Sequence, residues 1–236
     1  MTDIEADFVR VGDLHAYLAR PATGTEGGML LLPPLNGIDE QVREYAADIA
    51  ASGVTALVWD PWHGPSLDGS SYQKLLAMMG KLDDETCLAE MNALLDHAFG
   101  PLGLTKVGVI GWCLGGRLAL ILAGRDERLA NVVAYHPSIF SPPKANHTID
   151  TIESATAVTA PVMVLHAGAD TVMSTETFAD LQGALQSRRA GASIIHVYPG
   201  AEHAFSTRAR HSNPINAAAY AVSWPQVLQF VGDTTR

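Results

Sequence analysis

Short, continuously apolar runs alternate with longer helical segments along this chain, and that alternation limits its fold more than any other feature. Strands that are apolar throughout are typical of a parallel sheet covered by helices on both faces. The expected strands are Gly28–Leu32, Thr55–Trp59, Thr105–Ile110, Asn131–Tyr135, Pro161–His166 and Ser193–Tyr198. The expected helices are Asp39–Ala51, Asp83–Phe99, Leu114–Ala123, Thr175–Ser187 and Asn216–Val231. A hairpin of Asp7–Gly12 and Leu14–Arg20 precedes them, which brings the sheet to about eight strands, and Asp60–Ser71 is a Pro- and Gly-rich loop.

Composition excludes several classes of protein. With 47% hydrophobic and 17% charged residues, the 236-residue chain can bury enough apolar surface to fold, and we expect one domain over residues 1–236. A net charge of −10 and a pI near 5.2 argue against binding to nucleic acid or to anionic lipid. No run approaches the roughly 20 apolar residues of a membrane span.

The expected compartment is a reducing cytoplasm. Two cysteines, Cys87 and Cys113, cannot build a disulfide framework. The segment Met1–Arg10 is acidic and has neither the basic nor the apolar region of a secretion signal. The glycosylation sequon that begins at Asn146 is therefore interpreted as a chance match.

The strongest motif follows the expected strand that ends at Ile110. It reads Gly111-Trp112-Cys113-Leu114-Gly115-Gly116 and precedes an apolar helix, which is the G-x-C-x-G form of a nucleophile elbow. Glycines two residues either side of Cys113 relieve the crowding of such a turn, and the helix N-terminus favours a thiolate. The alternative is a buried structural cysteine. A dinucleotide-binding motif is less suitable, because the glycine spacing does not match G-x-G-x-x-G.

A general base and its acidic partner are expected at the carboxyl ends of later strands. Asp170 follows the strand that ends at His166, and His203 follows the strand that ends at Tyr198. Alternatively, Asp170 is an N-cap or turn residue for the helix that begins near Thr175, a role that can coexist with the catalytic one, and His203 is a surface loop residue. Three such residues, in nucleophile–acid–histidine order and each after its own strand, favour a Cys113–His203–Asp170 triad.

The remaining histidines and the second cysteine carry less information. We expect His166 to be a core residue with its hydrogen bonds satisfied, His136 either to line the pocket or to be structural, and Cys87 to be inert packing. The others have no metal-ligand spacing among them: His63, His97, His147, His196 and His211.

Together, the cysteine elbow, the segment His166–Asp170 and the segment Glu202–Phe205 resemble the dienelactone hydrolase family of α/β-hydrolases, over about residues 7–231. The resemblance implies an α/β-hydrolase fold, hydrolysis of an ester or lactone, and no metal or organic cofactor. It also implies that Cys113 is the nucleophile, with backbone N–H groups of Leu114 and Leu35 as the oxyanion hole.

Two departures from the family concern the substrate rather than the triad. A family glutamate that pairs with the resting nucleophile is replaced by Pro34. Arginines that hold a substrate carboxylate are also missing: the region before the second helix offers only Lys74 and Lys81, and Arg208 is not at the matching spacing. Both departures weaken dienelactone itself as the substrate.

The expected function is hydrolysis of a small-molecule lactone, ester or thioester through an acyl-enzyme. Acyl transfer on the same fold, and ligand binding without turnover, stay open as alternatives. The pocket is expected from Asn36, the loop Asp60–Tyr72 and the segment His136–His147. The candidate substrate contacts are Asn36, Trp62, Trp112, His136 and Phe205.

Overall fold

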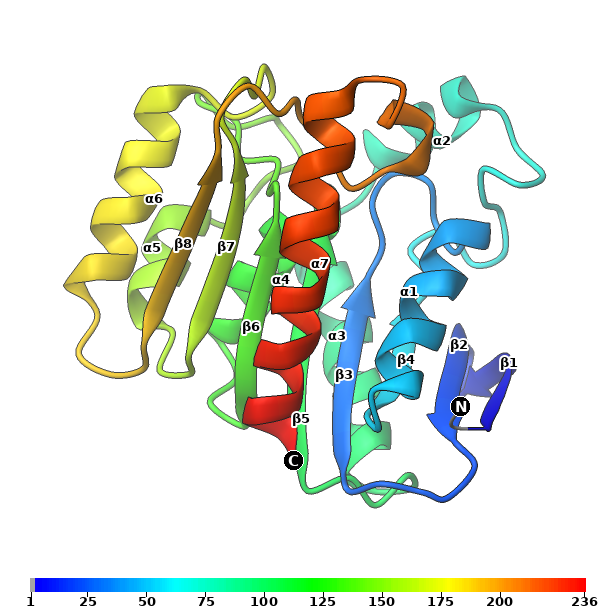
Figure 1. The fold of residues 1–236 in the computed structure, drawn as a ribbon. Helices are drawn as coiled ribbons and strands as arrows, with labels where there is room; N and C mark the ends of the chain where they lie inside the picture. The colour runs from blue at the N-terminus through cyan, green and yellow to red at the C-terminus, as the bar shows by residue number, and fades with distance from the viewer. Residues whose placement is uncertain (1–2) are drawn as a thin grey trace.

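Eight strands form one sheet in the computed structural model, which describes residues 3–236 (Figure 1). Met1 and Thr2, which begin the segment where we expect no leader, lie outside the described residues. The strands are β1 (Ile4–Val11), β2 (Leu14–Pro21), β3 (Gly27–Leu32), β4 (Thr55–Trp59), β5 (Lys106–Trp112), β6 (Leu129–Tyr135), β7 (Val162–Ala167) and β8 (Ser193–Tyr198). Their order is β1-β2-β4-β3-β5-β6-β7-β8, and every neighbouring pair from β4 to β8 is parallel. The predicted, mostly parallel sheet is confirmed.

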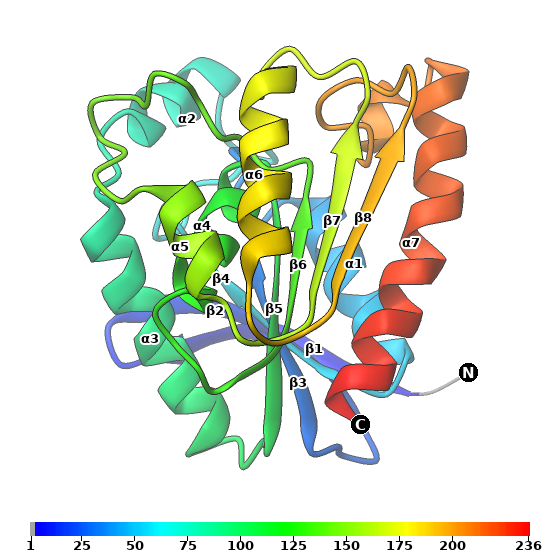
Figure 2. The same ribbon diagram turned by 90° about the vertical axis from the view of Figure 1, so that its left-hand side faces the viewer.

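Helices cover both faces of this sheet, as the apolar strands predict. The helices are α1 (Glu40–Ala51), α2 (Tyr72–Met79), α3 (Asp84–Phe99), α4 (Leu114–Ala123), α5 (Thr151–Ala157), α6 (Thr175–Ser187), α7 (Pro214–Thr235) and the short 3-10 helix η1 (Arg208–Arg210). Figure 2 shows α1 and α7 on one face and α3 to α6 on the other. Two separate hydrophobic clusters result, one on each side of the sheet.

Side-chain caps fix where the predicted helices begin. The carboxylate of Asp39 accepts the N–H of Val42 at 3.0 Å, and Asp83 accepts that of Thr86 at 2.9 Å. Such caps satisfy N–H groups that have no partner within the helix. These two helices therefore start within one residue of the predicted positions.

The hairpin prediction is also confirmed. β1 pairs antiparallel with β2, with Val11 opposite Leu14, so that Gly12 and Asp13 form the two-residue turn. Gly12 has a φ of +59°, which a two-residue hairpin turn favours.

Two helices, α2 and α5, were not predicted. α2 buries only Leu75, so its sequence lacks the repeating apolar positions of a helix that packs on a sheet. α5 has only seven residues and three of them are Thr or Ser, which are weak helix formers. Its start is set by Asp150, whose carboxylate accepts the N–H groups of Ile152 and Glu153.

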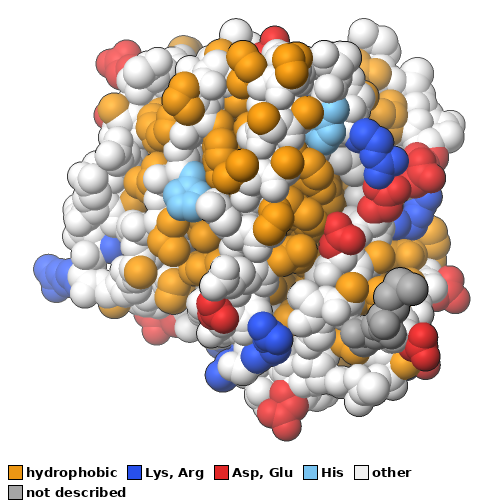
Figure 3. All heavy atoms as spheres, in the orientation of Figure 1, with side chains coloured by type: hydrophobic (Ala, Val, Ile, Leu, Met, Phe, Trp, Pro, Cys, Tyr) orange, Lys and Arg blue, Asp and Glu red, His pale blue; other side chains and the backbone are white. Residues whose placement is uncertain are grey.

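The surface over β8 and α7 is unusually apolar, as Figure 3 shows. Val197 on β8 and Val222 on α7 are about half exposed, at 48% and 55%. None of the helices in residues 3–236 is long and apolar enough to cross a membrane.

Candidate active site

The cysteine elbow forms the sharp turn that its glycines predict. β5 ends at Trp112, α4 begins at Leu114, and Cys113 between them has a φ of +53° and a ψ of −111°. This conformation is rare for a residue with a side chain and is typical of functional positions. A Cβ on Gly111 would overlap the carbonyl of Gly115, so the turn closes only with glycine at 111.

Gly115 also allows a second loop to lie close to Cys113. A Cβ at this position would overlap the carbonyl of Leu32 and lie 2.8 Å from that of Pro33. The chain after β3 can therefore pass close to the start of α4. Leu35 and Leu114, the two predicted oxyanion-hole residues, consequently line the same cavity as Cys113.

The loops after β7 and β8 bring together the predicted acid and base. Nδ1 of His203 lies 2.8 Å from Oδ2 of Asp170, and the side chains are 10% and 1% exposed. A backbone hydrogen bond from Ala169 to Ala201, at 2.8 Å, joins the two loops. Ala204 has a φ of +63°, which bends the chain just after the histidine.

Asp170 has a second role in its own turn. Its Oδ1 accepts the backbone N–H groups of Val172 at 2.7 Å and Met173 at 3.1 Å. The side chain that caps α6 is that of Ser174, so Asp170 is not the N-cap of this helix, but the alternative that it is a turn residue before the helix is confirmed. One oxygen of the carboxylate thus holds the turn, and the other faces the histidine.

Electrostatics couple Cys113 to His203. Burial acts to raise the pKa of the Cys113 thiol, but the charge of His203 acts in the opposite direction. Hydrogen bonds from the Ser138 hydroxyl and the Leu114 N–H add to this, so the pKa of the thiol lies below its ordinary value.

His203 shifts in the complementary direction. Burial opposes its charged form, but the charge of Cys113 and the hydrogen bond and charge of Asp170 raise the pKa of His203 to about 10. Burial acts to raise the pKa of Asp170 as well, yet the hydrogen bond and charge of His203 keep it below its ordinary value. Nε2 of His203 is buried and has no hydrogen-bond partner in residues 3–236, so the pKa shift that Cys113 causes in His203 reflects the nearby charge of Cys113 rather than a formed hydrogen bond.

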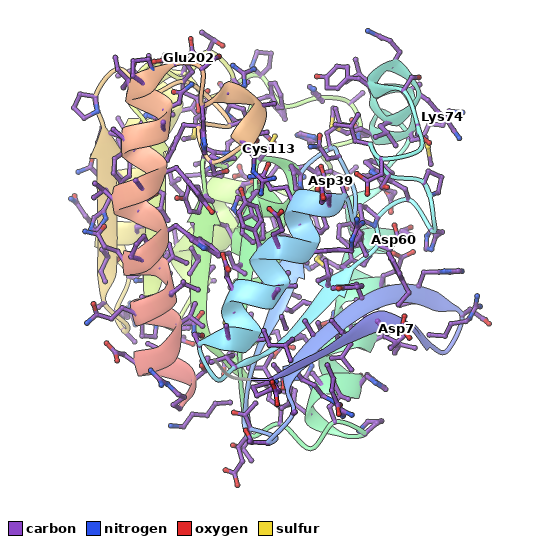
Figure 4. The ribbon with its side chains drawn as sticks, turned by 45° about the vertical axis from the view of Figure 1, so that its right-hand side comes forward. Asp7, Asp39, Asp60, Lys74, Cys113 and Glu202 are labelled. Atoms are coloured by element: carbon purple, nitrogen blue, oxygen red, sulfur yellow. The ribbon has the colours of Figure 1, made fainter. Side chains whose placement is uncertain are left out.

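A cavity of about 510 Å³ opens above Cys113. Its apolar lining comes from Leu35, Tyr72, Leu76, Met79, Phe140 and Val172. Its charged or titratable lining, besides Tyr72, Cys113 and His203, comes from Lys144, His147, Glu202 and Arg210. Glu202 is held by Asn216 at 3.0 Å and by Arg210 at 3.5 Å. Figure 4 shows Cys113 at the upper end of the sheet, below the loop that carries Glu202.

Of the predicted substrate contacts, only Asn36 lines this cavity. Trp62, Trp112, His136 and Phe205 are at most 3% exposed and pack beneath it. The Trp62 Nε1–H, for example, donates to the Leu35 carbonyl at 2.9 Å. The loop Asp60–Tyr72 was expected to build the pocket, and of its residues only the last, Tyr72, lines the cavity.

The two buried histidines, His136 and His166, differ in how well the structure matches the predictions. His136 is structural: its Nε2 lies 2.8 Å from the Ser206 hydroxyl, and burial and the charge of His203 hold its pKa well below the ordinary value. His166 is in the core, stacked on Phe178 at 3.7 Å. The expectation that its hydrogen bonds are satisfied is wrong, because its Nδ1 has no partner among residues 3–236.

Sequence reasoning missed the cations of the cavity. Lys74 lies on the outer side of α2 (Figure 4), Lys81 lines a different cavity, and Arg208 pairs with Glu44. Arg210 and Lys144 line the cavity instead. The signal for Arg210 was its place shortly after His203. Lys144 lies in the segment His136–His147, which was predicted to contribute to the pocket.

No metal site accompanies these residues. Within residues 3–236, no group of three His, Cys, Asp or Glu side chains could hold a metal ion.

A parallel sheet whose central strand ends in a cysteine elbow, with an acid and a histidine after later strands, defines an α/β-hydrolase. A profile of the dienelactone hydrolase family matches residues 14–235, so this chain belongs to that family of hydrolases.

Named relatives agree with this assignment. The chain is 27% identical over 240 residues to a "Probable 2-oxo-3-(5-oxofuran-2-ylidene)propanoate lactonase" of Bradyrhizobium sp, covering 97% of this chain and 94% of that protein. It is 27% identical over 224 residues to a "Putative carboxymethylenebutenolidase" of Escherichia coli O157:H7, covering 92% and 82%. A solved structure titled "Putative Dienelactone Hydrolase" from Klebsiella pneumoniae has a TM-score of 0.84 at 23% identity, covering 97% of this chain and 98% of that one, and supports the fold.

Proposed function

We propose that this protein hydrolyses a lactone, ester or thioester with Cys113 as nucleophile, His203 as base and Asp170 as the group that orients the base. The observation that carries the proposal is the elbow cysteine at a φ of +53°, electrostatically coupled to a histidine whose other nitrogen lies 2.8 Å from a buried carboxylate. Cys113 and His203 line a cavity large enough for a small ester or lactone, and Asp170 lies buried behind His203. A single domain over residues 1–236 and a cytoplasmic location are parts of the same proposal.

Acylation follows from this geometry. The Cys113 thiolate attacks the carbonyl carbon, forming a C–S bond, and the carbonyl electron pair moves to oxygen. The N–H groups of Leu35 and Leu114 stabilise that oxyanion. When the carbonyl re-forms, the C–O bond to the alcohol breaks, and the leaving oxygen takes the proton of the His203 imidazolium. A lactone leaves its alcohol attached to the acyl chain.

Deacylation uses the same groups in reverse. Neutral His203 removes a proton from water, the hydroxyl oxygen attacks the thioester carbonyl, and collapse of the second oxyanion releases the thiolate. Asp170 stabilises the imidazolium that forms in each half-reaction. The products are a carboxylic acid and an alcohol, and the resting thiolate–imidazolium pair is restored.

The resting state is part of the proposal. We infer that Cys113 rests largely as a thiolate paired with protonated His203 near neutral pH, because the thiol pKa is lowered and the pKa of His203 is raised to about 10. Pro34 lines the cavity without a carboxylate, and Glu202 is engaged by Arg210 and Asn216. Activation then needs no substrate carboxylate, and neutral esters should react as well as acidic lactones.

A substrate-panel assay tests the proposal. Purified protein is compared with its Cys113→Ala and Cys87→Ala variants on enol lactones, aryl esters and acyl thioesters, with and without a carboxylate. We expect a burst of product followed by turnover, lost in Cys113→Ala and retained in Cys87→Ala, whose thiol is buried away from the cavity. Binding without turnover on the whole panel, or full activity of Cys113→Ala, would contradict it.

A further inference from the structure

The chain after β6 turns back over the nucleophile and places Ser138 beside it. His136, the first residue after β6, donates its N–H to the Leu165 carbonyl at 2.8 Å, as a continuation of the β6–β7 ladder. It has a φ of +36°, and a non-glycine residue with positive φ marks a forced change of direction. Pro137 and Ser138 then run across the elbow rather than away from it.

Backbone hydrogen bonds fix Ser138 directly to Cys113. The Cys113 N–H donates to the Tyr135 carbonyl at 3.0 Å, and the Ser138 N–H donates to the Cys113 carbonyl at 3.0 Å. Both backbone groups of Cys113, its N–H and its carbonyl, are therefore hydrogen-bonded to the chain segment from Tyr135 to Ser138.

Gly116 makes this close approach possible. A Cβ there would lie 3.1 Å from the Pro137 Cα and 3.1 Å from the Tyr135 carbonyl oxygen, tighter than an ordinary van der Waals contact. The second glycine of the pair Gly115-Gly116 thus has its own purpose. Gly115 admits the loop after β3, and Gly116 admits the loop after β6.

The Ser138 side chain is 5% exposed and lines the catalytic cavity with Cys113. Its hydroxyl is one of the hydrogen-bonding groups that lower the pKa of the Cys113 thiol. Within residues 3–236 this hydroxyl has no nitrogen or oxygen acceptor that would draw it away from the sulfur, whereas Nδ1 of His203 is already occupied by Asp170.

Among the charged side chains of residues 3–236 that lie near Cys113, His203 alone is available to stabilise a thiolate, so a neutral hydrogen-bond donor could add to its effect. The titratable groups around Cys113 are His203 with Asp170 behind it, buried His136, and the cavity residues Lys144, His147, Glu202 and Arg210. Of the cations, Arg210 is paired with Glu202, and Lys144 lies 3.9 Å from the centre of the Phe140 ring. Pro34 has no donor at all. Apart from His203, Ser138 is therefore the side chain that can stabilise negative charge on the Cys113 sulfur.

We propose that Ser138 is a further catalytic residue of this site: its hydroxyl donates a hydrogen bond to the Cys113 sulfur and stabilises the thiolate in the resting and departing states. The inference rests on the proposed function only in taking Cys113 as the nucleophile. The hydroxyl makes and breaks no covalent bond. It stabilises the sulfur anion before attack and again when the thioester C–S bond breaks, because a thiolate of lower pKa leaves faster.

The test is the pH dependence of Cys113 alkylation by iodoacetamide, measured on the full chain without substrate. Thr and Val have nearly the same shape and differ in the hydroxyl, so Ser138→Thr and Ser138→Val form the matched pair, with Ser138→Ala as a third variant. We expect the apparent thiol pKa to rise by about one unit in the Val and Ala variants and to stay near wild type in the Thr variant, since a hydrogen bond to a charged group has about this value. Ser187→Ala, which removes a hydroxyl at the end of α6, outside the cavity, should leave the alkylation profile unchanged.

Equal alkylation profiles for the Thr and Val variants, or the same shift in Ser187→Ala, would overturn the role of Ser138. Melting temperatures of all variants show whether a shift reflects unfolding instead. Alkylation does not require turnover, so the two proposals can fail separately. If the protein hydrolyses no ester but Ser138→Val raises the apparent thiol pKa, the role of Ser138 stands and the proposed function fails. If the protein hydrolyses esters and Ser138→Val leaves the thiol pKa unchanged, the proposed function stands and the role of Ser138 fails.

Discussion

Replacing Asp170 with asparagine separates its two roles. Its Oδ1 holds the turn through Val172 and Met173, and its Oδ2 faces Nδ1 of His203 at 2.8 Å. In Asp170→Asn the amide oxygen can still accept the two turn N–H groups. The amide nitrogen then faces Nδ1 of His203. Both are hydrogen-bond donors, so they repel each other unless the imidazole changes to the tautomer that has its proton on Nε2.

The expected magnitudes differ for rate and for stability. Loss of the carboxylate that orients a triad histidine costs on the order of 10⁴ in catalytic rate in the serine-protease example, or about 5.5 kcal/mol at 1.36 kcal/mol per tenfold. The turn is retained, so stability changes only by the loss of one charge-assisted hydrogen bond, about 1.5 to 3 kcal/mol. Asp170→Ala, which also removes the turn acceptor, should lose stability further with a similar rate loss.

Single-turnover rates on an activated aryl ester, and urea unfolding of the same preparations, measure the two quantities. The reasoning is refuted if Asp170→Asn retains a rate within tenfold of wild type. It is also refuted if the rate falls only in proportion to the loss of folded protein, because Asp170 would then act solely through its turn.

Three further predictions concern reactivity and stability. Iodoacetamide should label Cys113 at least about a hundredfold faster than Cys87 near neutral pH, because burial raises the pKa of the Cys87 thiol to about 12; equal labelling on peptide mapping would contradict this. Asp84→Ala should cost about 3 to 5 kcal/mol in urea unfolding, because it leaves the Arg117 guanidinium, 2% exposed and bound at 2.7 Å, without its partner; a loss below about 1 kcal/mol would show that Arg117 finds other solvation. Burial and the charge of Arg117 lower the pKa of His147 to about 4, below its reference of about 6.5, so the unfolded state binds this proton first. The stability that neutral His147 contributes is therefore present above about pH 6.5 and is lost as pH falls toward 4; unfolding curves of wild type and His147→Gln that depend equally on pH across this window would refute it.

The fold was largely predictable because its signals are local and repeat along the chain. Each buried strand between β3 and β7 is an apolar run, and capping side chains mark the starts of α1 and α3. The placement of the triad candidates follows from the same pattern. In a parallel sheet the carboxyl ends of all strands lie at one edge, so residues after β5, β7 and β8 converge without any knowledge of side-chain packing.

The cavity lining was not predictable to the same degree. Tyr72 and Met79 reach the cavity from α2, a helix that packs too little apolar surface to leave a periodic pattern. Phe140 and Lys144 lie in an irregular segment whose path depends on distant contacts, such as the hydrogen bonds from Asn146 to the carbonyls after α2. Nothing in the local sequence encodes those contacts.

Trp112 was misplaced for a different reason, and alternation along β5 could have corrected it. Residues two apart in a strand point to the same side, and both Ile110 and Trp112 belong to the hydrophobic cluster beneath α1 and α7. Because neighbouring residues of a strand point to opposite faces of the sheet, the Trp112 indole points away from the cavity even though Trp112 directly precedes Cys113. There it stacks on Tyr45 with ring centres 4.7 Å apart.

The aromatic side chains expected to touch substrate act one layer below it. The hydroxyl of Tyr45, which stacks on Trp112, donates to the Ser206 carbonyl at 2.8 Å. The Ser206 hydroxyl in turn lies 2.8 Å from Nε2 of His136, and the His136 ring packs edge-to-face on His203 at 5.1 Å. Both sides of Ser206, three residues after the base, are thus tied to a rigid buried layer. In the proposed mechanism His203 exchanges protons with the leaving group and with water and pairs with the Cys113 sulfur between these steps. Its position then has to stay fixed while charges change, and a layer of packed rings gives that rigidity without adding a competing charge.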